Sequence, residues 1–204
     1  TANVVQAQLL FMESVDPKLR RPYRVEFGVY VKLDNPMSAY TMALLAFPSS
    51  KDETQGTDGS RYECDYATIA SPKGRVVIQR YDEDATLTWN TAEGKWDGAY
   101  APETGFGFQQ ELNVGGKYIY GASTGGFVPT VAGNYRITFY FQGSVVSLVG
   151  AQVGDYNGDL PKIGENNTAV VDDINDLTYM DVQATGGGGG GSGGKGGGIK
   201  GKRN

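Results

Sequence analysis

The chain has 204 residues, of which 39% are hydrophobic and 11% aromatic, and its net charge is −5. This length fits one large domain with a sizeable core, and the apolar fraction is too high for a disordered protein. Histidine is absent and cysteine occurs once, at Cys64, which excludes an intrachain disulfide, zinc-finger-type metal sites and triads built on Ser-His or Cys-His. No apolar run approaches the roughly 18 residues of a membrane helix, so no membrane span is predicted.

The chain begins with TANVVQAQ rather than with Met. A mature protein begins in this way after its signal peptide has been removed, although removal of Met in the cytosol gives the same start. The next stretch, residues 3–15, predicts either the first strand of a sandwich or a strand that pairs with the open sheet edge of a neighbouring subunit. We therefore divide the chain into an N-terminal strand (1–15), a β-sandwich domain (16–185) and a glycine-rich basic tail (186–204).

Alternation of apolar and polar residues dominates the domain. In YRVEFGVYVKL, residues 23–33, Val25, Phe27 and Val29 alternate with other side chains in the period of two that marks a half-buried strand. RYECDYATIA and NYRITFYF repeat the pattern, and turn signals such as SPKG and VAGN separate such stretches. Further strands are predicted at 39–47, 75–81, 85–89, 106–114, 117–121, 145–153 and 177–185. The sequence thus predicts an all-β fold, an immunoglobulin-like or jelly-roll β-sandwich with a glycine-rich C-terminal tail.

One of these stretches carries a resemblance to a known family. TVAGNYRITFYF, residues 130–141, resembles the penultimate strand of immunoglobulin-like domains in secreted prokaryotic proteins, in which a Gly-x-Tyr turn leads into an alternating strand. The resemblance implies a surface or filament subunit, located outside the cell or at its surface.

The stretch GDYNGDL, residues 154–160, has the spacing of a cation-binding loop. Asp155, Asn157 and Asp159 lie at i, i+2 and i+4, the spacing by which a tight loop directs three oxygen ligands at one ion. The stretch resembles a calcium loop of the dockerin or EF-hand type, and the resemblance implies bound calcium. Leu160 stands where such loops have Gly, which is a departure from the pattern.

The twelfth position of that loop is also unusual, because it is Asn166 rather than Glu or Asp. Asp172 or Asp173 supplies the missing carboxylate if the chain folds back. The predicted calcium ligands are therefore Asp155, Asn157, Asp159 and Asp173. The alternative is a plain loop between strands, because Asp, Asn and Gly are the commonest turn residues. Asn166 also opens the sequon Asn-Asn-Thr, which predicts a glycan there if the protein is exported.

The sequence contains no catalytic constellation, and we predict that the protein is not an enzyme. A glycoside hydrolase would need two facing carboxylates. Acidic residues such as Glu26 and Glu111 lie along strands, but nothing in the sequence pairs two of them across a cleft. Trp89 and Trp96 flank the turn-like stretch NTAEGK. They would stack on sugars in a carbohydrate-binding module, or lie buried in the core.

The tail, GGGGGGSGGKGGGIKGKRN, contains four basic residues and no acid. Subtracting its +4 from the net −5 leaves −9 on the rest of the chain, which does not suit a nucleic-acid binding face. Ordering such glycines costs about 1–2 kcal/mol per residue, and only pairing with other backbone offsets that cost. We therefore predict a subunit that binds itself, in an extracellular filament, pilus-like fibre or surface layer joined through its chain ends. The alternatives are a viral capsid or decoration protein, whose basic tail would reach nucleic acid, and a secreted carbohydrate-binding module.

Overall fold

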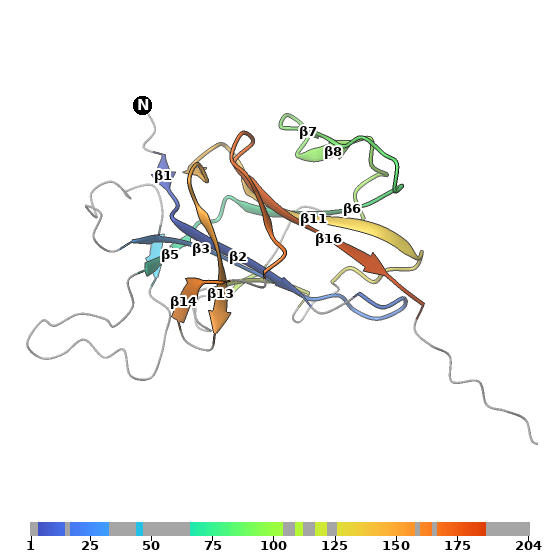
Figure 1. Cartoon of the computed structure of the whole chain (residues 1–204), viewed down its shortest axis with the longest axis horizontal. Helices are drawn as coiled ribbons and strands as arrows, with labels where there is room; N and C mark the ends of the chain where they lie inside the picture. Colours follow the sequence, from blue (N-terminus) through green and yellow to red (C-terminus); the bar gives the residue numbers. More distant parts are fainter. Residues whose placement is uncertain are drawn as a thin grey trace, which may run out of the picture.

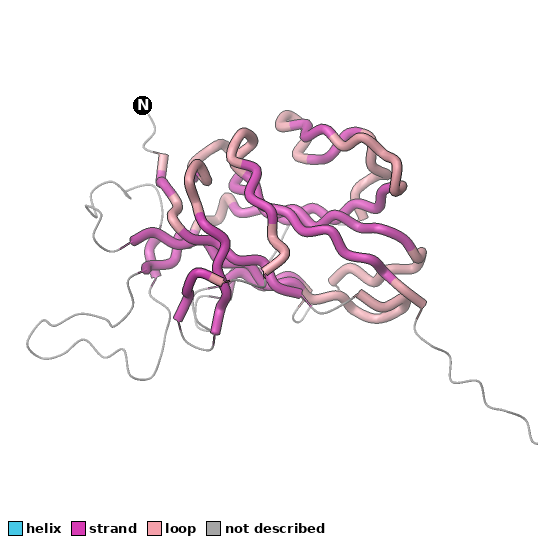
Figure 2. Tube along the Cα trace, in the orientation of Figure 1, coloured by secondary structure: helices cyan, strands magenta, loops and turns pink. Residues whose placement is uncertain are grey.

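The structure is a computed structural model, and it describes residues 4–14, 17–32, 44–46, 66–103, 109–111, 117–121, 126–157, 160–164 and 167–186. Within these ranges the chain is all-β, as predicted, and none of it forms a helix able to cross a membrane. Figure 2 shows strands joined by loops throughout this part of the chain. The single cysteine Cys64, the predicted calcium ligand Asp159, the predicted glycan site Asn166 and the tail after Gly186 lie outside the described residues.

The larger of the two main sheets has the order β14–β13–β2–β3–β10–β9, with β5 beside β3 and β4 beside β5 (Figure 1). Its neighbouring strands are antiparallel, except that β2 and β13 run parallel. The strands are β2 (Leu9–Ser14), β3 (Val25–Lys32), β4 (Leu44–Ala46), β5 (Tyr66–Ala70), β9 (Gln109–Glu111), β10 (Lys117–Tyr120), β13 (Gln152–Asn157) and β14 (Leu160–Ile163).

The smaller main sheet has the order β15–β16–β11–β6 and is antiparallel throughout. Its strands are β6 (Gly74–Tyr81), β11 (Gly133–Phe141), β15 (Val170–Asp172) and β16 (Leu177–Ala184). Two short pairs complete the fold: β1 (Val5–Gln6) runs parallel to β12 (Val146–Ser147), and β7 (Thr88–Asn90) forms a hairpin with β8 (Lys95–Asp97). In Figure 1 this hairpin lies over the smaller sheet.

The core lies between the two sheets, so the protein is sandwich-like. Phe27 of β3 stacks on Phe139 of β11, with ring centroids 4.8 Å apart, and Tyr118 of β10 packs against the same ring at 5.2 Å. The alternating residues of β3 that the sequence assigned to the core, Val25 and Phe27 among them, are buried. An immunoglobulin-like or jelly-roll topology stays a prediction.

The continuous apolar run LLFM has a specific structural cause. Leu10 and Met12 face the core between the sheets, whereas Leu9 and Phe11 form a second buried cluster with Tyr30. Since successive strand residues point to opposite faces, β2 is buried on both faces, and such strands lose the alternation of half-buried ones. Residues 5–14 are thus built into this chain's own sheets as β1 and β2.

One predicted strand proves to be two. The stretch 145–153 is divided into β12 and the start of β13 by a turn in which Ala151 N–H donates to the Leu148 carbonyl at 3.0 Å. Gly150 in this turn has a φ of 75°, a left-handed conformation that glycine adopts without steric cost. The prediction of one continuous strand was wrong because the apolar residues on either side conceal the turn.

Candidate functional site

Strand β16 has an edge that is only partly paired. Its whole length pairs with β11 on one side, from Leu177 to Ala184. On its other side, β15 pairs only with Leu177, Thr178 and Tyr179. Farther along, Thr185 forms a bridge with Lys18. Between these contacts, no strand among the described residues pairs with the second side of residues 180–184, which we call the β16 edge.

The direction of the backbone groups on this edge follows from the two contacts that flank it. Tyr179 faces β15, and the Thr185 carbonyl accepts a hydrogen bond from Leu19 N–H at 3.1 Å on the same side. Successive residues of a strand direct their N–H and C=O groups to opposite neighbours. Asp181 and Gln183 therefore direct theirs outward, where an added strand would meet two donors and two acceptors.

The opposite edge of the smaller sheet is covered. The Arg80 carbonyl of β6 accepts a hydrogen bond from Tyr100 N–H at 2.9 Å, and the Ile78 carbonyl accepts one from Glu103 N–H at 2.8 Å. These two carbonyls point away from β11, so the segment 100–103 occupies positions that a partner strand would need. Proteins commonly protect exposed edges in this way. The β16 edge has no such cover among the described residues.

The residues predicted to bind calcium are placed in two parts of the fold. Asp155 and Asn157 belong to β13, which forms a hairpin with β14, and Asp155 is the cross-strand partner of Lys162. The Asp155 carboxylate lies against the backbone of Gly164. Asp173 is exposed in the turn between β15 and β16. Among the described residues, no three His, Cys, Asp or Glu side chains gather into a metal-binding group. Calcium binding therefore stays a prediction, and it depends on Asp159.

The acidic residue Glu26 is held by two cations. Its carboxylate accepts hydrogen bonds from Arg24, at 2.7 Å from Nη2, and from Lys117. Burial alone would raise the pKa of Glu26, but the bonds from Lys117 and Arg24 outweigh it and lower the pKa. Glu13 is the cross-strand neighbour of Glu26. A carboxylate kept ionised by two cations is suited to stabilising the sheet, and it makes a poor proton donor for general acid catalysis.

The two tryptophans have different environments. Trp96 is buried, at 5% exposure, and its indole Nε1 donates a hydrogen bond to Thr138 Oγ1 at 2.8 Å. Trp89 is partly exposed, and its ring packs edge-on against Trp96 and against Tyr140, with centroids 5.4 Å and 5.1 Å away. The core interpretation therefore holds for Trp96, whereas Trp89 has surface available to a ligand.

Trp89 and Tyr140 line a groove at one end of the smaller sheet. Three turns surround it: 91–94 between β7 and β8, 142–145 after β11, and 173–176 between β15 and β16. The volume of this groove, which we call the aromatic groove, is about 460 Å³. Besides the two rings, its lining includes Arg75, Gln142, Asn175 and Asp176. Sequence reasoning singled out only Trp89 here, because residues from three distant turns carry no common local pattern.

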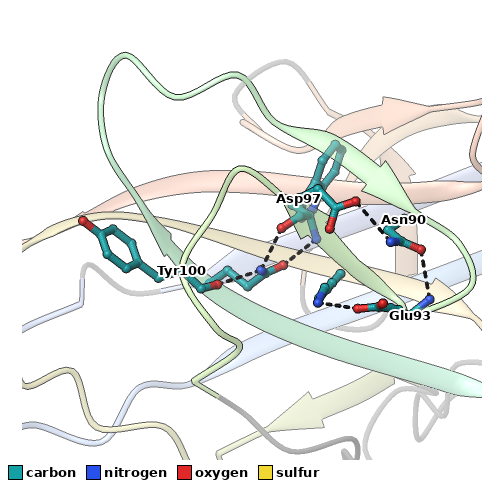
Figure 3. Close-up of polar contacts among 7 residues, drawn as sticks. Asn90, Glu93, Asp97 and Tyr100 are labelled. Carbon is teal, nitrogen blue, oxygen red and sulfur yellow. Dashed lines mark hydrogen bonds and ion pairs between the residues drawn. The ribbon is translucent and has the colours of Figure 1, made fainter.

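A buried glutamine of the smaller sheet helps to fix the hairpin that carries Trp89. Gln79 of β6 accepts a hydrogen bond from Trp96 N–H at 2.7 Å and donates to the carbonyls of Trp96, at 3.1 Å, and Tyr100, at 2.9 Å. At the tip of the hairpin, Asn90 accepts from Glu93 N–H at 3.2 Å and donates to Asp97 at 3.1 Å (Figure 3). This network sets the position of one wall of the groove.

Comparison of the chain with protein-family models, with curated proteins and with solved structures found no match.

Proposed function

We propose that the protein is a structural subunit of an extracellular homopolymeric assembly, such as a filament, pilus-like fibre or surface layer, joined by strand addition at the β16 edge. The supporting observation is the unpaired side of residues 180–184, which lies between β15 and the bridge to Lys18. At about 3.4 Å per residue, a segment of some five residues fills this gap. Export, and a glycan at Asn166, belong to the same proposal.

The segment that fills the edge is the glycine-rich tail of a neighbouring subunit. The N-terminal strands are a poor choice, because β1 and β2 are already paired and buried inside their own chain. A glycine-rich strand brings no bulky side chains, so its backbone approaches an edge without steric conflict. The tail also carries +4 against an otherwise acidic chain, which favours contact with a neighbour of the same kind.

The size of the edge limits how strong one joint is. Asp181 and Gln183 offer four outward backbone groups, and each hydrogen bond contributes about 0.5–1.5 kcal/mol net. The resulting few kcal/mol, less the entropy lost by the tail, correspond to millimolar affinity at best. A stable assembly therefore also needs the charge contact and repetition of the joint along a polymer.

The test is negative-stain microscopy of the full chain, of a chain ending at Gly186, and of two variants at Gln183. Gln183→Pro removes an outward N–H and leaves the pairing with β11 intact, whereas the control Gln183→Ala keeps that N–H. We expect long particles from the full chain and from Gln183→Ala, and monomers from the truncated chain and from Gln183→Pro. Melting curves establish that each variant is folded.

Two results would refute this proposal. One is a full chain that stays monomeric at high concentration. The other is normal polymerisation by both the truncated chain and Gln183→Pro. Closed shells, with nucleic acid bound in a strongly salt-dependent manner, would instead support the capsid alternative.

A further inference from the structure

We propose that the aromatic groove binds a neutral oligosaccharide, with the rings of Trp89 and Tyr140 as its apolar walls. This binding site is separate from the proposed assembly joint. Asn175 and Asp176 lie in the groove just before β16 begins, whereas the β16 edge is at the other end of that strand. Either site would operate without the other.

The two rings offer both an apolar surface and free polar groups. Their planes meet at 70°, so they form a corner rather than a flat platform. The C–H face of a pyranose packs against such a ring as any apolar surface does, while its hydroxyls need donors and acceptors. Within the described part of the chain, no hydrogen bond occupies the Trp89 indole N–H or the Tyr140 hydroxyl. Both groups can therefore bond to sugar hydroxyls at the edge of the stacked ring.

The remaining lining favours a ligand without charge. The charged residues of the lining are Arg75, Asp176 and Glu93, and Glu93 forms an ion pair with Lys95, so no single sign of charge dominates the groove. Asp176 uses its Oδ1 to accept hydrogen bonds from Leu148 N–H at 2.8 Å and Ser147 Oγ at 3.2 Å, which holds the carboxylate in place at the rim. Its Oδ2 has no partner among the described residues, and the Gln142 amide adds a donor and an acceptor.

The groove is preformed and of suitable size. Its volume of about 460 Å³ falls within the range of about 300–1,000 Å³ that is usual for small-ligand sites, and suits a short oligosaccharide. The Gln79 network and the Trp96–Thr138 hydrogen bond fix the hairpin that carries Trp89. Because this wall is already ordered, binding loses little conformational entropy.

The experiment begins with the full chain on an array of immobilised neutral oligosaccharides built from glucose, mannose, galactose and N-acetylglucosamine, together with acidic glycans. The best-binding soluble oligosaccharide is then titrated while tryptophan fluorescence is recorded. Trp96 is buried, so the signal change should come from Trp89. We expect Trp89→Ala and Tyr140→Ala to weaken binding roughly tenfold or more, as loss of an aromatic anchor typically does.

Tyr100→Ala is the matched control. Tyr100 is 43% exposed, and its ring packs against the Arg80 guanidinium outside the groove. This variant should bind as the unmodified chain does. Tyr140→Phe, which removes only the hydroxyl, should bind a few-fold more weakly. If the alanine variants do not fold, this variant provides the test of binding in the groove. The inference is overturned if no neutral oligosaccharide binds, if only acidic glycans bind, or if folded groove variants bind normally.

Discussion

Replacing Gln79 by Leu tests the role of the network that fixes the β7–β8 hairpin. Gln79 is 1% exposed, and its amide makes three hydrogen bonds to the backbone of Trp96 and Tyr100. Leucine is similar in size to glutamine, although it branches at Cγ, so this substitution removes the polar contacts with only a modest change of packing. The cost is then mainly that of backbone groups left without partners.

The expected loss of stability follows from which groups can find water. The Tyr100 carbonyl belongs to an exposed residue and can be rehydrated, whereas the N–H and carbonyl of buried Trp96 cannot unless the hairpin lifts from the sheet. An unsatisfied buried group costs about 1–3 kcal/mol. Two such groups would cost about 2–6 kcal/mol if they stayed buried. We expect a loss of roughly 2–4 kcal/mol, because the hairpin can lift from the sheet and expose both groups to water before the full penalty is reached.

The assay is equilibrium urea unfolding followed by tryptophan fluorescence, with Gln152→Leu as the control. Gln152 is an exposed glutamine on β13, and its substitution should change stability by less than about 0.5 kcal/mol. Gln79→Leu should also weaken any ligand binding in the aromatic groove, because one wall is no longer fixed. A loss below about 1 kcal/mol for Gln79→Leu would show that the network does not hold the hairpin.

Three further predictions concern a charge, two glycines and a metal. Glu26 has a lowered pKa, so it stabilises the folded state at neutral pH, and this stability is lost as pH falls below the ordinary value of 4.5. Glu26→Gln should therefore lower the free energy of unfolding at pH 7 but not at pH 2 to 3, and an equal loss at both pH values would contradict the assignment. Gly121 and Gly143 share left-handed φ values of 87° and 84°, but only at Gly121 would a Cβ meet backbone, at 2.1 Å from the Tyr23 carbonyl oxygen. Gly143→Ala should cost about 1 kcal/mol and Gly121→Ala on the order of 3 kcal/mol or more by urea unfolding, and similar losses would show that the backbone yields at the close contact. If Asp155 and its predicted partners hold calcium, chelator should lower the melting temperature and added calcium restore it, whereas an unchanged value removes the proposed site.

Much of the strand content could be predicted from the sequence, because the alternation of apolar and polar residues within a segment reflects which of its side chains are buried. Residues 75–81, 117–121 and 177–185 were predicted as strands, and the structure has β6, β10 and β16 there within one residue at each end. The stretch 145–153 was not resolved into two strands, since a tight turn between apolar residues leaves only a single glycine as its signal. Local pattern thus determines that a segment is extended, but it does not reveal a tight turn inside an apolar stretch.

The candidate sites could not be predicted in the same way. Trp89 was singled out by its residue type, but Tyr140 and Asp176 reach the same groove only because three turns, far apart in the chain, meet at one end of the smaller sheet. The spacing of Asp155 and Asn157 indicated a loop, whereas the tertiary structure places both in the β13–β14 hairpin.

The sequence by itself determined that this is an all-β protein with a glycine-rich basic end, because composition and the two-residue period are properties of each segment alone. Only the tertiary structure decided which edge stays unpaired. Residues 180–184 of β16 are as strand-like as their neighbours. They lack a second partner because β15 begins only at Val170, opposite Tyr179, and the strand before it in the chain, β14, belongs to the other sheet. Strand pairing is a long-range property, and no local pattern specifies which neighbour a strand will lack.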